Sequence, residues 1–459
     1  MLDAFATDQA ESRIFGPIAF RWQFGISSAK SLKAAGSKYM AEGSSASEII
    51  AALEEPDARL SPQAEVVGIE ALSQMTDVAQ GIMSLVRKRA LAPSLEKSPR
   101  RYSMTEVAEL MRIPRKTLDY YIRTKGLPQG EIDNRKRLFT LADIEAFRKH
   151  TGALPWRGAG TQPAIITVAN NKGGVGKTSC AIHAAQYFAR RSYRVLIVDL
   201  DPQASLTTVF GYLPDSDIPD EATTLPFFRG ETDSLSGAIR KTHWHLLDLI
   251  PANLGLSDAE FSLASRAGRE VGFVFYQPLL SGLEKVSENY DVIILDTPPA
   301  QGFITLNALF AATGLLIPLT PVMMDFASVG TFLRLLTTNL EVINRYEGQE
   351  KSFDFVRIAL SKFEGSNKIH QQIERWVRQG FSGSVLSNNL ALSAALRTGP
   401  DLLTAYEASF ENAKRTLDRR TLHRAIEFLD SVNEELEDLI RARWAAQELA
   451  ANAGAGELA

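Results

Sequence analysis

The residues most able to do chemistry form one glycine-rich stretch, KGGVGKTS, at positions 172–179. It follows an apolar run and precedes a helical one, which predicts a turn from a buried strand into a helix. In such a turn, successive backbone N–H groups and the positive end of the helix bind phosphate oxygens. Lys177 would then neutralise the β- and γ-phosphates, and the hydroxyl of Thr178 would ligate Mg²⁺. The predicted phosphate loop comprises Gly173, Gly174, Val175, Gly176, Lys177, Thr178 and Ser179.

The stretch also contains a second lysine, Lys172, which a phosphate-binding loop does not ordinarily need. The general pattern G-x-x-x-x-G-K-[ST] is not met either, because Asn171 occupies the position of its first glycine. From the residues alone, Lys172 is either an exposed loop lysine or a functional one. Both interpretations are open at this point.

Three aspartates stand at the ends of apolar runs. Asp199 and Asp201 end the run RVLIVDLD, and Asp296 ends the run YDVIILD. Ligands of open α/β sheets bind beside the carboxyl ends of the strands, so we expect these side chains beside the phosphate loop. Any one of them alone would more simply cap the next helix, but three together indicate a functional site. Asp296 has the form of a Walker B carboxylate, which orients Mg²⁺.

Six apolar runs alternate with helical stretches between about residues 164 and 415. They are AIITVAN, RVLIVDLD, HLLDLIP, YDVIILDTPP, GLLIPLT and FVRIALSKF. Continuous Val, Ile and Leu runs separated by helices are typical of a parallel sheet that is covered on both faces. The predicted fold class is therefore α/β: a P-loop NTPase fold with a mostly parallel sheet and helices on both faces. One long helix is predicted near the end, over residues 421–450.

A basic segment precedes this predicted sheet. The residues MTEVAELMRIPRKTLDYYIRTKGLP (104–128) have the spacing of a helix-turn-helix, with its turn near Pro114. The next residues, GEIDNRKRLFTLADIEAFRKH (130–150), resemble the wing and closing helix of a MerR-like module. Local excess of basic residues in a chain with a net charge of −4 indicates DNA binding, and a solvated charged face is the alternative. The residues predicted to contact DNA are Arg115, Lys116, Thr117, Tyr120, Arg135, Lys136 and Arg137.

These features predict five consecutive regions. They are an N-terminal helical region (1–98), a MerR-like winged helix-turn-helix domain (99–151), a linker (152–163), a domain with the phosphate loop and a long C-terminal helix (164–450), and a disordered tail (451–459). The N-terminal region contains an amphipathic helix over residues 61–91, because Ser61 and Pro62 begin a stretch with helical apolar spacing. That helix packs either on a partner copy or on its own chain.

The order K-G-G-V-G-K-T, V-D-L-D-P-Q and D-T-P-P resembles the ParA/MinD group of deviant Walker-A ATPases over roughly residues 163–415. The resemblance implies that Lys172 reaches across a face-to-face homodimer to the partner's bound phosphates. It also implies that Asp201 positions the attacking water, that Asp199 and Asp296 organise the Mg²⁺ shell, and that 297–299 sense the γ-phosphate. Hydrolysis of ATP would therefore depend on dimerisation, with Lys172, Lys177 and Asp201 as the catalytic residues.

Composition excludes several kinds of relative. A single cysteine, Cys180, cannot hold an iron–sulfur cluster or form a disulfide within the chain. No run reaches the ~18–20 apolar residues that span a bilayer, and the last helix, which contains EELEDL, lacks the basic face of a membrane-targeting helix. We therefore expect a cytoplasmic protein without a membrane partner.

The helix-turn-helix ahead of the ATPase resembles the larger plasmid-partition ParA proteins, including RepA of the repABC type. That resemblance implies that region 1–98 contributes to dimerisation and that 164–450 is a ParA-type ATPase domain. It also implies operator binding, autoregulation, non-specific nucleoid DNA binding in the ATP state, and a ParB/RepB-like centromere-binding partner that stimulates hydrolysis. The expected function is therefore segregation of a replicon. The alternatives are an ATP-gated transcriptional regulator, or a positioning ATPase that carries a protein cargo along the nucleoid.

Overall fold

The computed structural model describes residues Ile69, Leu72, Ser73, Thr76, 97–133, 135–348, 350–391, 403–408 and 419–456. The chain divides into two compact units, Met1–Leu85 and Val86–Ala459. In the first unit, the described residues are helical and fall within the helix predicted over 61–91, while the rest of that prediction lies outside the described residues. The N-terminal region 1–98, which is predicted to dimerise, also lies mostly outside the described residues. No described helix combines the length and apolar character needed to cross a membrane.

A seven-stranded sheet forms the centre of the second unit. Its strands are β4 (Ala164–Val168), β5 (Val195–Asp199), β6 (Arg240–Lys241), β7 (Leu247–Ile250), β8 (Val292–Asp296), β9 (Gly314–Leu319) and β10 (Phe355–Leu360). They lie in the order β10-β9-β4-β8-β5-β7-β6, and all neighbours are parallel except β6 and β7. Each of the six apolar runs forms one strand, so the predicted parallel sheet is confirmed. The sequence does not predict β6, because its two residues are charged and carry no apolar pattern.

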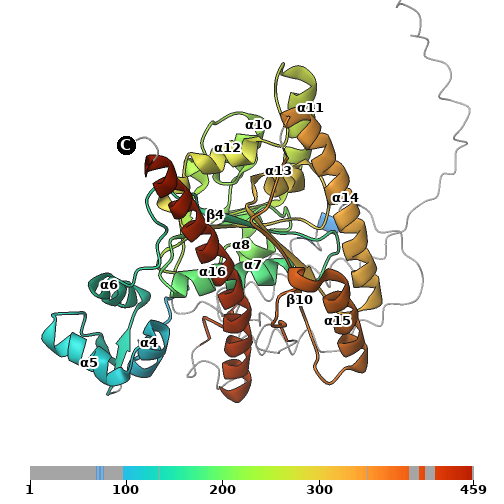
Figure 1. Ribbon diagram of the computed structural model, residues 1–459. Helices are drawn as coiled ribbons and strands as arrows, with labels where there is room; N and C mark the ends of the chain where they lie inside the picture. The colour runs from blue at the N-terminus through green and yellow to red at the C-terminus, as the bar shows by residue number, and fades with distance from the viewer. Residues whose placement is uncertain are drawn as a thin grey trace, which may run out of the picture. The chain divides into compact units, whose positions relative to one another are not determined.

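Helices cover both faces of this sheet (Figure 1). They are α7 (Lys177–Arg190), α8 (Ser205–Val209), α9 (Pro214–Asp217), α10 (Leu225–Arg229), α11 (Asp258–Arg269), α12 (Pro278–Glu284), α13 (Phe303–Ala311), α14 (Met323–Glu347), α15 (Lys368–Phe381) and α16 (Arg419–Gly456). Side chains alternate along each strand, so Ile197 packs in the cluster with α7 and α16 whereas Val198 packs in the cluster with α10–α13. The strands β9 and β10 share a third cluster with α14 and α15.

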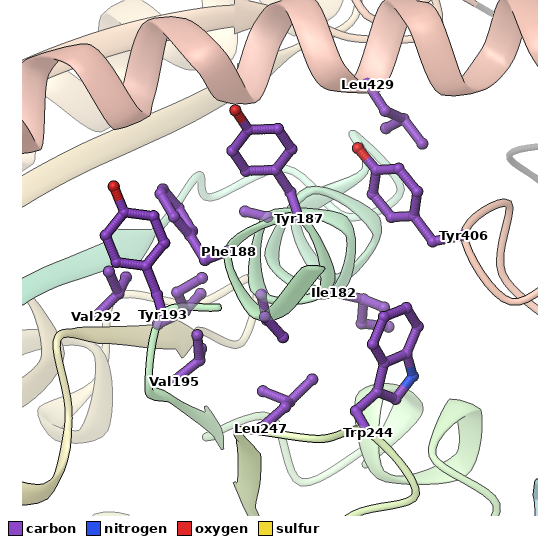
Figure 2. Close-up of a cluster of buried hydrophobic side chains, with 14 of the residues drawn as sticks. Ile182, Tyr187, Phe188, Tyr193, Val195, Trp244, Leu247, Val292, Tyr406 and Leu429 are labelled. Atoms are coloured by element: carbon purple, nitrogen blue, oxygen red, sulfur yellow. The ribbon is translucent and has the colours of Figure 1, made fainter. Parts of the chain in front are cut away.

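The long helix α16 is held on α7 by a buried carboxylate. Glu437 is 4% exposed and accepts hydrogen bonds from the hydroxyls of Tyr187 (2.7 Å) and Tyr193 (2.8 Å). Figure 2 shows both hydroxyls directed toward α16 from rings that pack in the core below it. The helix continues to Gly456, beyond Ala450, whereas the sequence predicts a disordered tail from residue 451. Alanine is the best helix former, so the alanines that follow Ala450 extend the helix.

Residues 102–151 form a winged helix-turn-helix. Its elements are β1 (Tyr102–Ser103), α4 (Met104–Met111), α5 (Arg115–Thr124), β2 (Glu131–Asp133), β3 (Lys136–Phe139) and α6 (Leu141–Thr151). Ser103 and Thr140 each begin a helix with a capping box, so both helix starts are specified locally. Arg112 adopts a left-handed conformation (φ 53°) that ends α4, and Pro114 then precedes α5. The predicted tight turn is therefore confirmed.

The winged module and the α/β domain share one buried cluster. Tyr102, Phe139 and Phe147 of the module belong to the same cluster as Phe188 and Tyr406. Polar contacts reinforce this junction: Lys97 pairs with Glu407 at 2.9 Å, Arg100 donates to the carbonyl of Tyr406 at 3.0 Å, and His245 contacts Glu145 at 2.5 Å. The predicted linker also packs on the domain, since Trp156 donates to the carbonyl of Ser192 at 2.8 Å. The two parts therefore form a continuous structure.

Candidate nucleotide site and basic surface

The glycine-rich stretch lies where the sequence predicts it, between β4 and α7. Gly174 (φ 75°) and Gly176 (φ 93°) both adopt left-handed backbone conformations, which a residue with a Cβ rarely tolerates. Gly176 is also the N-cap of α7, so the backbone N–H groups at the start of that helix face the loop. These turns, together with the exposure of Gly173 and Gly174, leave the loop open to an anion.

Lys177 lies inside this loop rather than in solvent. Its side chain is largely buried, and its Nζ donates to the carbonyl oxygen of Lys172 at 3.2 Å. Burial lowers the pKa of Lys177, and the nearby carboxylates of Asp296 and Asp201 oppose that shift. The ammonium group is therefore already directed into the curve of the loop, where phosphate oxygens would bind.

Asp296 is an acidic group that is fully buried at the end of β8. Among the described residues, neither of its carboxylate oxygens has a hydrogen-bond partner. Burial and the adjacent charge of Asp199 raise the pKa of Asp296 well above its usual value, while the hydroxyl of Thr178 and the charge of Lys177 oppose the rise. A divalent cation held between Asp296 and Thr178 would satisfy these oxygens, so the residues fit Mg²⁺.

The other two aspartates occupy different environments. Asp199 pairs with Asp296 in the parallel register of β5 and β8, but its Oδ2 already accepts from the N–H (2.9 Å) and hydroxyl (2.7 Å) of Thr207. Asp201 is half-buried and accepts from the N–H of Gln203 at 3.0 Å. Among the described residues, no group of three or more His, Cys, Asp or Glu could hold a metal by itself. A metal here would therefore need phosphate or water oxygens as further ligands.

Lys172 stands at the entrance of the loop. Its backbone N–H donates to Oδ1 of Asn170 at 3.0 Å, and its side chain is half-buried. Within the described part of the chain, its ammonium group has no hydrogen-bond or ion-pair partner.

Thr297, which begins the predicted switch segment 297–299, donates from its hydroxyl to the carbonyl of Val168 at 2.9 Å. It thereby ties the end of β8 to the strand that leads into the loop.

Sequence reasoning missed two residues, directly after the end of β10, that contact the loop. The hydroxyl of Ser361 donates to the carbonyl of Val175 at 2.7 Å, and Nζ of Lys362 donates to the carbonyl of Gly174. These residues are 186 and 188 positions away from their partners, so no local pattern marks them. The only signal in the sequence is that they follow directly on an apolar strand run, as the predicted aspartates do.

The predicted DNA-contacting residues lie on the recognition helix and the wing of the winged module. Arg115 and Lys116 are exposed at the start of α5, and Tyr120 is exposed in its middle. The opposite face of this helix buries Leu118 and Ile122. Arg135 stands in the turn between β2 and β3 (φ 64°). The remaining predicted residues are Thr117 on α5 and Lys136 and Arg137 on β3. These side chains therefore come from the two elements with which winged modules contact DNA.

Comparisons with known proteins cover both parts of the chain. The model of the AAA domain family matches residues 163–349, and that of the MerR HTH family regulatory proteins matches residues 102–153. The second match contains α4, α5, the wing and α6. The helix-turn-helix interpretation of this segment is therefore confirmed, and the segment is more than a charged helical domain.

Relatives match most of the chain. It is 32% identical over 397 residues to the putative replication protein A of Rhizobium rhizogenes, covering 83% of this chain and 96% of that protein. It is 31% identical over 365 residues to protein SopA of Escherichia coli (strain K12), covering 77% and 92%. The sporulation initiation inhibitor protein Soj of Bacillus subtilis (strain 168) is 29% identical over 256 residues, covering 55% and 95%. A solved structure of a partition protein has the same fold, with 20% identity, a TM-score of 0.54, and coverage of 78% and 98%.

Proposed function

The chain belongs to the ParA/MinD-type family of deviant Walker-A ATPases, in the group with an N-terminal helix-turn-helix, and from this premise we propose that it is a partition ATPase that segregates a replicon. ATP is its substrate and Mg²⁺ its cofactor. The observation that carries the proposal is that one chain combines the phosphate loop, an exposed recognition helix, and a buried carboxylate at Asp296 that has no hydrogen-bond partner in the described part of the chain. Relatives named as replication and Sop proteins support the partition role.

We assign a role in ATP hydrolysis to each of these side chains. The loop binds the phosphates through its N–H groups and the ammonium group of Lys177. Thr178 and Asp296 would hold Mg²⁺, which would supply positive charge to offset the charge of the nucleotide's phosphates. Asp199, fixed by Thr207, supports this shell from the adjacent strand. Asp201 stands two residues beyond the end of β5, where it orients the attacking water.

Lys172 completes the site of a second copy. Its ammonium group has no partner in the described part of the chain, as expected of a cation that serves another subunit. In a face-to-face homodimer it would neutralise charge that develops on the partner's γ-phosphate, as an arginine finger does. ATP hydrolysis would then require the dimer. The dimer would dissociate once the γ-phosphate is lost.

The winged module adds a second function, the binding of operator DNA. Arg115, Lys116, Thr117 and Tyr120 would read an operator in the major groove, while Arg135, Lys136 and Arg137 contact phosphates beside it. The module would thereby repress the chain's own operon. The ATP-bound dimer binds nucleoid DNA without sequence preference, and a ParB/RepB-like centromere-binding protein stimulates hydrolysis and releases it.

Retention of a marked replicon tests this proposal. Cells carrying the wild-type gene should keep the replicon, and cells carrying Asp201→Ala should lose it, because a stalled ATPase cannot cycle. Arg115→Ala with Lys116→Ala should lose operator footprinting while in vitro ATPase activity stays intact. Equal retention with the wild-type gene and with the gene deleted would refute the partition role.

A second candidate is an ATP-gated transcriptional regulator. The packing of the winged module on the α/β domain favours it. The phosphate loop lies at the start of α7, and Arg191, directly after its end, donates to the carbonyl of Leu110 in α4, so nucleotide binding could alter the module through this helix. Deletion would then change operon expression without loss of the replicon. A ParB-like gene directly downstream would favour partition instead.

A further inference from the structure

The phosphate loop is held from outside by two consecutive residues that follow β10. Ser361 is 3% exposed, and its hydroxyl donates to the carbonyl of Val175 at 2.7 Å. Lys362 is exposed, and its Nζ donates to the preceding carbonyl, that of Gly174. Two successive carbonyls of the loop are therefore bound by two successive side chains that follow another strand.

Binding these carbonyls fixes the direction of the next two N–H groups. In a planar trans peptide, the C=O of one residue and the N–H of the following residue point in opposite directions. The carbonyls of Gly174 and Val175 point toward Ser361 and Lys362, so the N–H groups of Val175 and Gly176 point away from them, toward the inside of the loop. Neither N–H has a hydrogen-bond acceptor among the described residues, which leaves both available to an anion.

The backbone around Ser361 and Lys362 is itself fixed. The N–H of Ser361 donates to the carbonyl of Leu319 at 2.9 Å, and that of Phe363 donates to the carbonyl of Leu390 at 3.0 Å. Between them, Lys362 adopts a left-handed conformation (φ 52°), which is sparsely populated for a residue with a Cβ. Such conformations persist where the surroundings hold them and often occur at functional sites. Here the side chains of Ser361 and Lys362, on either side of one peptide bond, both reach the phosphate loop.

We propose that Ser361 and Lys362 are positioning residues of the nucleotide site. They hold the peptide planes of the loop so that the N–H groups of Val175 and Gly176 face the β-phosphate before any nucleotide binds. A loop arranged in advance loses less conformational freedom on binding, so the pair raises the affinity for both ADP and ATP. Because both nucleotides carry a β-phosphate, the effect should be similar for the two. This inference rests on the proposed nucleotide site.

Binding and turnover measured on the full chain test the proposal. Ser361→Ala and Lys362→Met should each raise the Kd for ADP, measured by calorimetry, by about 3- to 10-fold. The KM for ATP should rise by a similar factor while kcat changes by less than about twofold, because the lost interactions act equally in the ground state and the transition state. Lys362→Arg keeps a cationic donor and should restore the wild-type Kd to within about twofold.

Lys368→Met is the matched control, since Lys368 is an exposed lysine at the start of the nearby helix α15. The thermal midpoint of each nucleotide-free variant separates loop positioning from loss of folding. If Ser361→Ala lowers that midpoint, the Kd of Lys362→Met still tests the proposal, because replacing the exposed Lys362 side chain should not disturb folding. Kd values for Ser361→Ala and Lys362→Met equal to that of Lys368→Met would overturn the inference. Failure of the wild-type chain to bind ADP would instead refute the proposed nucleotide site.

Discussion

At the scale of single residues, the environments of the three aspartates assign them different tasks. Asp296 is fully buried and has no hydrogen-bond partner within the described ranges, whereas both oxygens of Asp199 accept from neighbouring groups. Asp201 lies beyond the strand end and is partly open to solvent. An unpartnered buried carboxylate is costly unless a cation satisfies it. Asp296 is therefore the residue on which metal binding should depend most.

Asp296→Asn tests the metal site. It keeps the size of the side chain but removes the charge, so Mg²⁺ binding in the presence of ADP should weaken by at least tenfold. Calorimetric titration of the ADP-bound protein with Mg²⁺ measures this. Chelation of Mg²⁺ should abolish ATP turnover by the wild-type chain. Unchanged Mg²⁺ affinity in Asp296→Asn would show that the metal binds elsewhere.

Asp201→Ala separates binding from chemistry. Loss of the group that orients water should reduce kcat by about 100-fold or more, with ATP affinity changed by less than about threefold. Phosphate release and calorimetry with ATP are the two measurements. Asp217→Ala, at the end of α9 and outside the loop, should leave kcat unchanged. A parallel loss of affinity and kcat would mean that Asp201 acts mainly in binding.

At the scale of elements, the features that the sequence predicts correctly are those that a local pattern of residues specifies. The KGGVGKT loop, the six apolar runs and the turn before Arg115 are each contiguous stretches, and each is found where it is predicted. Contacts between distant segments leave no such pattern. The pairing of Lys362 with Gly174 and that of Lys97 with Glu407 join residues 188 and 310 positions apart. These contacts depend on the folded sheet, so the sequence alone does not reveal them.

The recognition helix α5 makes a prediction at this scale. Arg115→Ala with Lys116→Ala should weaken operator binding by at least tenfold at physiological salt, because both cations stand at its exposed start. A gel-shift titration at several salt concentrations should also give a shallower salt dependence, since fewer counterions are released. Arg420→Ala with Arg424→Ala, on α16, is the charge-matched control. Equal operator binding by both double variants would contradict the assignment of α5.

At the scale of the whole molecule, Glu407 joins the segment that leads into the winged module to the α/β domain, because it binds Lys97 on one side and His243 on the other. Its side chain is 7% exposed and contacts Lys97 at 2.9 Å, His243 at 2.6 Å and the indole nitrogen of Trp244 at 3.1 Å. Burial opposes ionisation of Glu407, but the hydrogen bond from His243 and the charge of Lys97 outweigh it and lower its pKa to about 2. The ionised carboxylate is therefore the form that stabilises the junction.

This depressed pKa predicts a pH-dependent stability. The contribution of Glu407 should be complete above its unfolded pKa of 4.5 and should disappear as the pH falls through about 2. At neutral pH, Glu407→Gln should lower the free energy of unfolding by roughly 3 kcal/mol. The difference from the wild-type protein should shrink below pH 4.5. Urea denaturation across this range measures it, with the exposed Glu427→Gln as a control. A difference that does not vary with pH would contradict this account of the junction.

Complementation between two inactive variants tests the central claim, a site shared between two subunits, most directly. Lys172→Gln lacks the cation lent to the partner, and Asp201→Ala lacks the group that orients water in its own site. Each should be inactive alone. In an equal mixture, half of the dimers are mixed and hold one complete site, so phosphate release should recover to about a quarter of the wild-type rate. If Lys172 instead serves its own nucleotide, no complete site can form, and a mixture as inactive as its components would contradict the account.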